Sequence, residues 1–412
     1  MRTLKLIALV SLAVAGIGLH GQTRSPADWP QWRGPNRDGS AGSFNAPAAW
    51  PEQLTRKWKT EVGLGYATPV LVGNRIYMFS RQGENETMSA LDAASGAVRW
   101  KTGYPATFTM NNATARHGPG PKSTPVFASG KLFSIGMTGA VSAFDAATGK
   151  LLWQKPGSPI VPTFTTHAFS PVVEGNLAIF HVGGHNQGAL TAFDVNTGDV
   201  KWSWNGDGPS YGSPIVATID GARQVITLTQ GKLIGVEVAT GALLWERAFV
   251  SNNNTNSATP ILFGRTIIAS NGGPVVAVTV SKRNNQWVVE NAWENADTPF
   301  RLSNSVLAGD LLFGLSTRNS GQYFAVDVKS GQTLWTSEPR QAGNAAIARA
   351  GELLFSLEDD AELVVVRASR TAFEVLKRYT VADSSTWAQA SYSGNRVFVK
   401  DESTVALWTV NP

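Results

Sequence analysis

The chain has 412 residues and a formal net charge of +5, and only 16% of its residues are charged. Its lysines and arginines are scattered singly, so the sequence has no basic stripe and nucleic acid is not expected as a partner. Cysteine is absent, which excludes disulfides and predicts no lipid anchor on an N-terminal cysteine. A chain of this length can bury a sufficient core without disulfides. Its 41 glycines and 14 tryptophans favour many short strands joined by tight turns.

The first predicted element is a signal peptide over residues 1–21. Arg2 and Lys5 provide its basic start, and the mostly apolar run from Leu6 to Leu19 is too short to span a membrane. Its removal takes away two of the 35 basic residues and none of the 30 acidic residues, which leaves a net charge of +3. We therefore expect a periplasmic or secreted protein that is monomeric and at most peripheral to a membrane.

An N-terminal extension follows over residues 22–54, and we expect it to pack on the domain behind it. Its segment DWPQWRGPNRDGS, residues 28–40, contains two tryptophans and two prolines, which is typical of a rigid, partly apolar stretch. A ligand-binding role for Arg33 or Arg37 is the less favoured interpretation of the two arginines in this segment.

One phrase then recurs along the chain. It reads SALDAASGAVRW at 89–100, SAFDAATGKLLW at 142–153 and TAFDVNTGDVKW at 191–202. The alternating apolar residues predict a strand, the Asp accepts backbone hydrogen bonds in a turn, and the Gly suits a left-handed backbone. The Trp at the end of the second strand predicts packing between neighbouring units. The phrase therefore predicts a β-hairpin that ends in a packing anchor.

A second strand–turn–strand pattern precedes each hairpin, as in ATPVLVGNRIYMF at 67–79 and STPVFASGKLFSI at 123–135. The two patterns together make a four-stranded unit, and eight units can be counted along the chain. The fifth hairpin (VAVTVSKRNNQW, 276–287) and the seventh (VVVRASRTAFEV, 364–375) are degenerate copies. The eighth unit stops after its third strand, TVALW at 404–408.

The missing strand of the eighth unit lies at the other end of the repeat region. RKWKTEV, residues 56–62, is similar to the Trp-bearing fourth strand of the other units. Pairing of the two terminal strands closes a ring and leaves no open sheet edge. The sequence therefore predicts an all-β fold, an eight-bladed β-propeller of four-stranded antiparallel blades over residues 55–412, closed by pairing of the N- and C-terminal strands.

The pattern apolar-Asp-x-x-Thr-Gly-x-x-x-Trp resembles the repeat of the pyrroloquinoline-quinone-like (PQQ-like) β-propellers over about residues 55–412. That superfamily includes quinoprotein alcohol dehydrogenases and the propeller lipoprotein of the bacterial outer-membrane barrel-assembly machinery. Residues 28–40 also look like a leader of exported superfamily members. The resemblance implies the fold more firmly than a function, because the matching residues are structural.

Function is expected in loops on one face of the propeller, over the central channel. Most units place a polar or hydrogen-bonding aromatic residue just before the innermost strand. These candidate ligand-binding residues are Tyr66, His117, Lys122, His167, Tyr211, Asn256, Arg301 and Trp387. A solvated channel mouth is the simpler interpretation of the same residues.

The histidines give a second candidate site. Imidazole is the commonest metal ligand and the usual acid–base group near neutral pH. The four histidines beyond the signal peptide, all predicted on the same face in the second and third blades, are His117, His167, His181 and His185. Their spacing matches no zinc signature, so no metal is assigned and hydrogen-bonded loop histidines are favoured. The acidic loop 358–360 is likewise expected to be a solvated turn rather than a cation site.

No catalytic motif is recognised. The favoured function is therefore a non-catalytic binding or scaffolding module of the cell envelope, without a cofactor, whose partner is an envelope protein, a peptide or a glycan. The resemblance offers a quinoprotein oxidoreductase with PQQ and calcium as the alternative, in which Lys122 and Arg301 pair with carboxylates and Trp387 stacks on the quinone. Those enzymes carry an adjacent-cysteine disulfide, which this chain lacks. An enzyme that uses the histidines of blades two and three is the remaining alternative.

Overall fold

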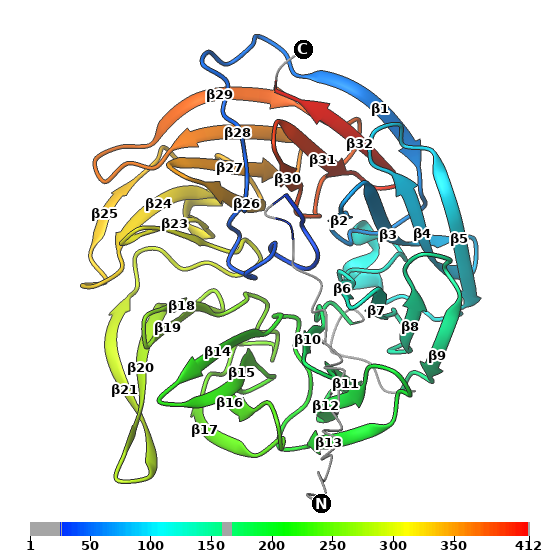
Figure 1. Cartoon of the computed structure of the whole chain (residues 1–412). Coiled ribbons are helices and arrows are strands. Elements are labelled where there is room, and N and C mark those ends of the chain that lie inside the picture. Colours follow the sequence, from blue (N-terminus) through cyan, green and yellow to red (C-terminus); the bar gives the residue numbers. More distant parts are fainter. Residues whose placement is uncertain (1–24, 26, 159–166, 411–412) are drawn as a thin grey trace, which may run out of the picture.

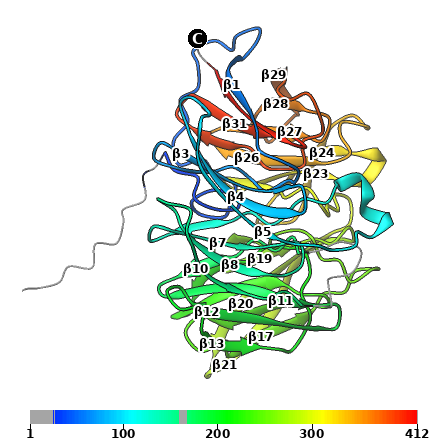
Figure 2. The ribbon, with the colours of Figure 1, turned by 90° about the vertical axis from the view of Figure 1, so that its right-hand side faces the viewer.

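The computed structural model describes residues 25, 27–158 and 167–410, so the predicted signal peptide lies outside the described residues. Over these residues, eight four-stranded antiparallel sheets surround a central axis (Figure 1), and Figure 2 shows the same ring from the side. The predicted eight-bladed propeller is therefore confirmed. No helix in the described ranges is long and apolar enough to cross a membrane.

Each blade runs from an innermost strand beside the axis to a fourth strand on the outer wall. The innermost strands of blades one to eight are β2 (Val70–Val72), β6 (Val126–Ala128), β10 (Val172–Glu174), β14 (Ile215–Ile219), β18 (Ile261–Phe263), β22 (Val306–Ala308), β26 (Ala345–Ala350) and β30 (Ser391–Ser393). The second strands are β3 (Arg75–Gln82), β7 (Lys131–Ile135), β11 (Leu177–Gly184), β15 (Ala222–Leu228), β19 (Thr266–Ala269), β23 (Leu311–Ser316), β27 (Leu353–Glu358) and β31 (Arg396–Lys400).

The outer half of each blade completes the sheet. The third strands are β4 (Asn85–Asp92), β8 (Val141–Asp145), β12 (Gln187–Asp194), β16 (Lys232–Glu237), β20 (Val275–Arg283), β24 (Gln322–Asp327), β28 (Glu362–Arg367) and β32 (Thr404–Thr409). The fourth strands are β5 (Val98–Pro105), β9 (Leu151–Lys155), β13 (Val200–Trp204), β17 (Leu243–Ala248), β21 (Gln286–Asn295), β25 (Thr333–Thr336), β29 (Glu374–Thr380) and β1 (Thr55–Glu61). Short 3₁₀ helices, η1 (Asn112–His117) and η2 (Arg318–Ser320), lie in connecting segments.

The alternating strand directions give the ring two different faces. The rim face carries the loops between blades and the turns between second and third strands. The hairpin face carries the turns between first and second strands and between third and fourth strands.

The ring closes through the two ends of the repeat region. Strand β1 pairs antiparallel with β32, with Thr55 opposite Thr409 and Glu61 opposite Thr404. The first strand of the ring in the sequence is thus the outer strand of blade eight, as the sequence predicts. This closure pairs the edge of β32 that the C-terminal blade would otherwise leave open.

The Asp–Gly turn of the repeat folds as predicted. In blade two, Asp145 Oδ1 accepts hydrogen bonds from the backbone N–H groups of Ala147 (3.1 Å) and Thr148 (2.8 Å). Gly149 has a φ of 76°, and a Cβ added there would lie 2.4 Å from the ring of Trp100 in blade one. The glycine is therefore required both by the turn and by the tryptophan of the preceding blade.

In most blades an anchor tryptophan of the fourth strand packs against the next blade. Trp153 of blade two packs beside Phe193 of blade three, with ring centroids 6.2 Å apart, and its indole N–H donates to the carbonyl of Val195 (3.3 Å). The same donation to a carbonyl of the following blade recurs at Trp58, Trp202, Trp293 and Trp335. The predicted packing role of the repeated Trp is confirmed.

Blade five departs from the predicted register. Its degenerate copy of the repeat ends at Trp287, but the hairpin of β20 and β21 is longer than its counterparts. Trp293 takes the anchor position instead, where it contacts Gly331 of blade six and donates to the carbonyl of Val328 (2.8 Å). Trp287 stands near the hairpin tip, with Lys282 Nζ 6.0 Å from its ring centroid.

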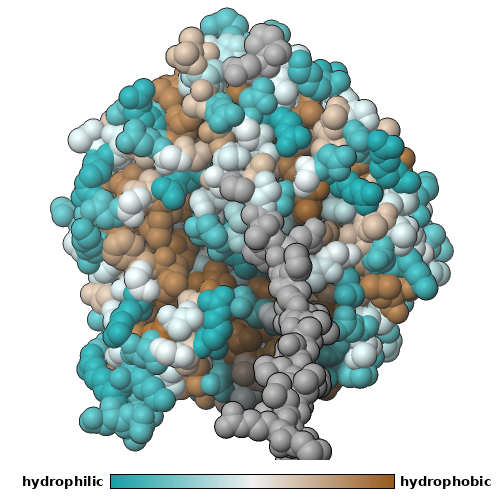
Figure 3. Space-filling view, viewed as in Figure 1, coloured by the Kyte–Doolittle hydropathy of each residue, from teal (hydrophilic) through white to brown (hydrophobic). Residues whose placement is uncertain are grey.

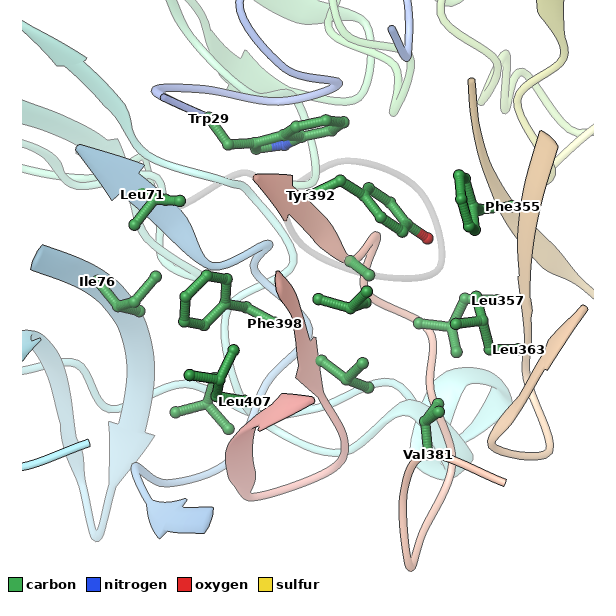
Figure 4. Packing of buried hydrophobic residues seen from close by; sticks show 14 of the residues in the cluster. Trp29, Leu71, Ile76, Phe355, Leu357, Leu363, Val381, Tyr392, Phe398 and Leu407 are labelled. Carbon is green, nitrogen blue, oxygen red and sulfur yellow. The ribbon is translucent and has the colours of Figure 1, made fainter. Parts of the chain in front are cut away.

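Most of the hydrophobic core lies between neighbouring blades. The cluster at the ring closure joins Leu71 of blade one, Phe398 of blade eight and Phe355 of blade seven (Figure 4). Trp29 of the extension is fully buried in the same cluster, and its ring centroid lies 5.7 Å from that of Tyr392. The extension therefore contributes to the core at the place where the ring is closed.

The extension crosses the axis on the hairpin face (Figure 1). Asp28 Oδ1 accepts a hydrogen bond from the backbone N–H of Gly73 (2.9 Å), in the first turn of blade one. Further hydrogen bonds reach residues in or next to the innermost strand of every blade. From blade one to blade eight they join Trp29 to Leu71, Pro30 to Phe127, Arg37 to Ser170, Arg37 to Pro214, Trp32 to Thr259, Arg33 to Ser305, Ala41 to Arg349 and Asn45 to Gly394.

Candidate functional site

Contacts divide the predicted rim residues into three groups. The first, around blades eight, one and two, is Tyr66, His117, Lys122 and Trp387. The second, before blades four to six, is Tyr211, Asn256 and Arg301. His167 belongs to a third group with His181, which the sequence also proposes as a candidate.

Lys122 organises the first group. Its ammonium lies 5.5 Å from the centroid of the Tyr66 ring. It donates hydrogen bonds of 2.7–2.8 Å to three carbonyls of its own loop, those of His117, Gly118 and Gly120. The imidazole of His117 meets the ring of Trp387 edge-on, with centroids 4.5 Å apart. The group therefore joins the loop before blade two to the loop before blade eight.

Lys400 is a buried cation beside this group that the sequence does not reveal. Its ammonium donates to the carbonyls of Asp401 (2.7 Å) and Glu402 (2.9 Å). Burial, and next the charge of Lys400, lowers the pKa of Lys122 to about 7. Burial also lowers the pKa of Lys400 to about 8 and raises that of Tyr66 to about 12. Both lysines direct their protons at carbonyls, so they hold loops in place rather than face a ligand.

The second group is held by Asn256. This side chain is fully buried, and its amide nitrogen donates to the carbonyls of Thr229 (2.8 Å), Gln230 (3.2 Å) and Phe249 (2.7 Å). The carbonyl of Asn256 accepts the backbone N–H of Tyr211 (3.1 Å). Arg301 Nη2 donates to Thr255 Oγ1 (2.9 Å). The predicted rim asparagine therefore fastens the loop before blade five and does not line a solvent-facing site.

His167 and His181 form a buried pair. Their exposed fractions are 1% and 0%. Burial lowers the pKa of His167 to about 3, with the charge of His181 as the second cause, and lowers the pKa of His181 to about 4. Nε2 of His181 is 3.1 Å from the carbonyl oxygen of Asp207, while neither ring nitrogen of His167 has a hydrogen-bond partner among the described residues. Both imidazoles are therefore neutral at physiological pH.

The other two histidines make contacts of their own. His185 Nδ1 lies 2.5 Å from Nε2 of Gln230, and His117 contacts Trp387. Within the described residues, no three His, Cys, Asp or Glu side chains form a group that could hold a metal ion. The pair of His167 and His181 alone does not supply the three or four protein ligands of a typical zinc site.

Glu358 does not lie in a solvated turn, which corrects the expectation for loop 358–360. It is 1% exposed, and its carboxylate accepts a hydrogen bond from the hydroxyl of Tyr323 (2.6 Å). Arg378 Nη1 lies 3.6 Å from the other carboxylate oxygen. Burial raises the pKa of Glu358 to about 7, against the opposing effects of Tyr323 and Arg378. The carboxyl thus joins blades six and seven.

We expect Glu358→Gln to change the pH dependence of stability. The folded protein holds the Glu358 proton up to about pH 7, whereas the unfolded chain releases it at the model value of 4.5. The wild type therefore loses unfolding free energy as the pH rises through this interval, and a glutamine, which cannot ionise, does not. Urea denaturation should show the variant gaining stability relative to the wild type between about pH 4.5 and about pH 7. A difference that stays constant with pH would contradict the raised pKa.

A groove of about 710 Å³ opens on the outer wall where blade eight meets blade one. One side is formed by residues 61–64 at the end of β1 and by the turn 81–83. Val98, Trp100 and Lys101 of β5 line the other side. Val98 is 49% exposed, so the groove presents apolar surface beside the exposed charges of Lys101 and Glu61.

Two residues that line the groove carry a buried polar atom without a hydrogen-bond partner among the described residues, Ser89 Oγ and Trp100 Nε1. Blades two and three satisfy the corresponding hydroxyls from the fourth strand: Gln154 donates to Ser142, and Thr191 pairs with Ser203, both at 2.9 Å. In blade one the residue opposite Ser89 is Lys101, whose ammonium lies 3.4 Å from Gln82 Oε1. Blade one therefore leaves unpaired a buried hydroxyl that its two neighbours satisfy, although buried polar groups are normally paired.

The sequence analysis missed this groove because it concentrated on the loops of the rim face. A sequence difference between copies of the repeat could have indicated the groove. The position opposite Ser89 is a lysine, whereas its counterparts in blades two and three are the small or amide side chains of Gln154 and Ser203. A comparison of the hairpins strand by strand distinguishes blade one from its neighbours.

The PQQ alternative fits these residues poorly. Lys122 has three carbonyls for its three ammonium protons, so it has no donor left for a quinone carboxylate. Arg301 donates one hydrogen bond to Thr255, although its buried Nε has no partner among the described residues, and Trp387 contacts His117. The described part of the chain also offers no group of three acidic or histidine ligands for calcium. No chemical step is derived through the quinone.

Comparisons with known sequences connect the chain to one family. Residues 84–337 match the family model described as outer membrane protein assembly factor BamB. The protein of that name from Yersinia pestis is 25% identical over 225 residues, which cover 52% of this chain and 56% of the relative. The one from Shewanella oneidensis is 27% identical over 262 residues, 59% and 63% of the two chains. The polyvinylalcohol dehydrogenase of a Sphingopyxis species is 26% identical over 276 residues, 54% and 40%. The chain thus spans roughly half to two thirds of the length of these two BamB relatives.

Solved structures share the fold. BamB from Moraxella catarrhalis superposes with a TM-score of 0.60 at 15% identity, covering 86% of this chain and 99% of that structure. The quinohemoprotein alcohol dehydrogenase ADHIIG from Pseudomonas putida HK5 has a TM-score of 0.66 at 14% identity, covering 93% and 80%. At these identities the likeness concerns the fold alone.

Proposed function

Since the chain belongs to the PQQ-like β-propeller family whose model is described as outer membrane protein assembly factor BamB, we propose that it is a non-catalytic binding and scaffolding propeller of the cell envelope. The relatives from Yersinia pestis and Shewanella oneidensis support an envelope protein as its partner. The signal peptide predicted over residues 1–21 supports export to the periplasm or beyond. N-terminal sequencing of the mature protein tests the export step.

The groove between blades eight and one is the observation that carries this proposal. It presents the exposed side chain of Val98 on the outer wall, with residues 61–64 forming the facing side. An extended segment of a partner protein can pack an apolar side chain against Val98. The exposed charges of Glu61 and Lys101 at the same groove add a polar rim, as is usual at protein interfaces.

We expect Val98→Asp to weaken partner binding by roughly tenfold or more, because it places a charge in the apolar centre of the interface. The exposed position of Val98 lets the fold tolerate this change. Val375→Asp is the matched control, since Val375 is 39% exposed on β29 of blade seven. Affinity purification of the tagged mature protein from solubilised envelopes, with quantified partner yield, measures the effect. The same partner yield from both variants, or no reproducible partner with the wild type, would overturn the proposal.

A further inference from the structure

A second cavity, of about 430 Å³, opens between the extension and the innermost strands of blades four to seven. We call it the axial pocket. Its apolar wall includes Ile215, Val216, Ile261, Leu262 and Leu307. Figure 3 shows apolar surface in the left half of the view, beside the central extension. The opposite wall is polar and comes from extension residues 33–38, joined by Arg349 of β26.

Arg33 places in this wall a buried guanidinium whose hydrogen-bonding groups are not all paired. It is 2% exposed, and its Nη2 donates to the carbonyls of Ser305 (2.7 Å) and Asp38 (3.0 Å). Its Nε is buried and has no hydrogen-bond partner among the described residues. Burial lowers the pKa of Arg33 to about 10, although the charge of Asp38 opposes this effect. A buried guanidinium without a bonded carboxylate is rare, since buried charges are usually paired.

Arg349 adds a second available guanidinium. Its backbone is fixed to the extension, because its N–H donates to the carbonyl of Gly39 (2.8 Å) and its own carbonyl accepts the N–H of Ala41 (2.7 Å). Its half-buried side chain lines the pocket and makes no hydrogen bond or ion pair within the described part of the chain. The pairing of β26 with the extension thus positions this cation at the pocket.

The charges around the pocket do not balance. Three arginines line it, counting Arg37, against the single carboxylate of Asp38. Oδ1 of Asp38 accepts the backbone N–H of Ser40 (2.8 Å) and does not bond a guanidinium in the described residues. The backbone of Arg33 and Arg37 is also strained, with a φ of 59° at both residues. The pocket therefore combines an excess of positive charge with an apolar wall.

We propose that the axial pocket binds an organic carboxylate with an apolar body. The carboxylate accepts hydrogen bonds from the Arg349 guanidinium beside the positive charge of Arg33, and the apolar body packs on Leu262 and Leu307. Arginine is suited to this task because its planar fork matches the two oxygens of a carboxylate. The volume is sufficient for a small ligand or for the last residues of a peptide. Both sources present the same chemistry to the pocket.

Isothermal titration of the mature protein tests this inference with defined probes. N-acetylleucine represents a free small acid, and acetyl-Ala-Ala-Leu with a free C-terminus represents a peptide end. We expect at least one of these acids to bind. The amide of the same compound should bind at least tenfold more weakly, because it lacks the negative charge. The affinity of the acid should fall with added salt. Binding of N-acetylleucine alone identifies a small acid as the ligand type, and binding of the peptide alone identifies a peptide terminus. Failure of both acids to bind, or equal binding of acid and amide, would overturn the inference.

Arg349→Gln locates the site. The Arg349 side chain makes no hydrogen bond or ion pair within the described residues. Removal of its charge should therefore leave the melting temperature near that of the wild type. We expect the affinity for the acid to fall at least tenfold while that for the amide is unchanged. Arg283→Gln is the control, because Arg283 is an exposed arginine paired with Glu290 at the tip of blade five. Equal acid binding by Arg349→Gln and the wild type would show that the ligand does not use this pocket. The axial pocket and the outer groove share no lining residue, so either proposal can fail alone.

Discussion

Trp153→Ala should destabilise the protein by about 3–5 kcal/mol, the usual range for an emptied aromatic site in a core. Trp153 is 9% exposed and packs against Phe133, Phe193 and the hairpin glycine Gly198 of the next blade. The alanine leaves a cavity between blades two and three and removes the hydrogen bond to the carbonyl of Val195. Urea denaturation followed by tryptophan fluorescence measures the loss in unfolding free energy.

Trp287→Ala is the control for this effect. Trp287 belongs to the degenerate fifth repeat and stands near a hairpin tip, where it is only partly buried. Its removal should cost less than half as much as that of Trp153. A loss below about 1 kcal/mol for Trp153→Ala is the size expected of a surface residue and would contradict the anchor role of the repeated tryptophan.

Arg37→Asn should destabilise the protein by about 3–5 kcal/mol, because it leaves buried carbonyls of two blades without their charged donor. The Arg37 guanidinium is 4% exposed and donates to Ser170 O (2.9 Å), Pro171 O (2.9 Å) and Pro214 O (2.7 Å). Asparagine is the chosen replacement because it tolerates the left-handed backbone of this residue, so the loss reports the guanidinium and not the turn.

The same urea experiment measures the Arg37 variant, with Arg367→Asn as its control. The Arg367 side chain is 58% exposed, and its guanidinium is 3.8 Å from Glu374, so its removal should change stability by less than about 1 kcal/mol. Equal stabilities of the two variants would show that the extension contributes little to the ring. Arg37→Lys should also lose stability, since one ammonium cannot reproduce the planar fork that spans carbonyls of blades three and four.

The sequence predicted the ring because its local and long-range signals agree. The Asp and Gly of SAFDAATGKLLW form one turn, and the Trp fits the glycine of the next copy, so a single phrase specifies both a hairpin and its neighbour. The terminal strand 56–62 follows from the same count. The anchor of blade five was not predicted, because the degenerate fifth copy, 276–287, does not reveal that a longer hairpin places the anchor at Trp293.

The candidate site was less predictable for a physical reason. Sequence position shows which loop carries a residue, but not whether its side chain faces solvent or neighbouring carbonyls. Asn256 and Lys122 are placed in rim loops, yet their donors are directed at backbone oxygens of those loops. Arg33 and Arg37 donate hydrogen bonds to backbone carbonyls that are far away in the sequence, those of Ser305 and Pro214. Backbone carbonyls are the same in every residue, so the sequence does not indicate which of them act as acceptors. The outer groove arises from the meeting of the two chain ends and is visible only in the closed ring.

Photo-cross-linking from the groove tests most directly whether this propeller acts by holding an envelope protein. A photoreactive residue at Lys101, which lines the groove, should form one discrete adduct in intact cells, and excess unlabelled protein should compete for it in extracts. Lys329 is the control position, because its side chain is 67% exposed outside the residues that line the groove. No adduct from Lys101, or the same adduct from Lys329, would contradict a partner site between blades eight and one.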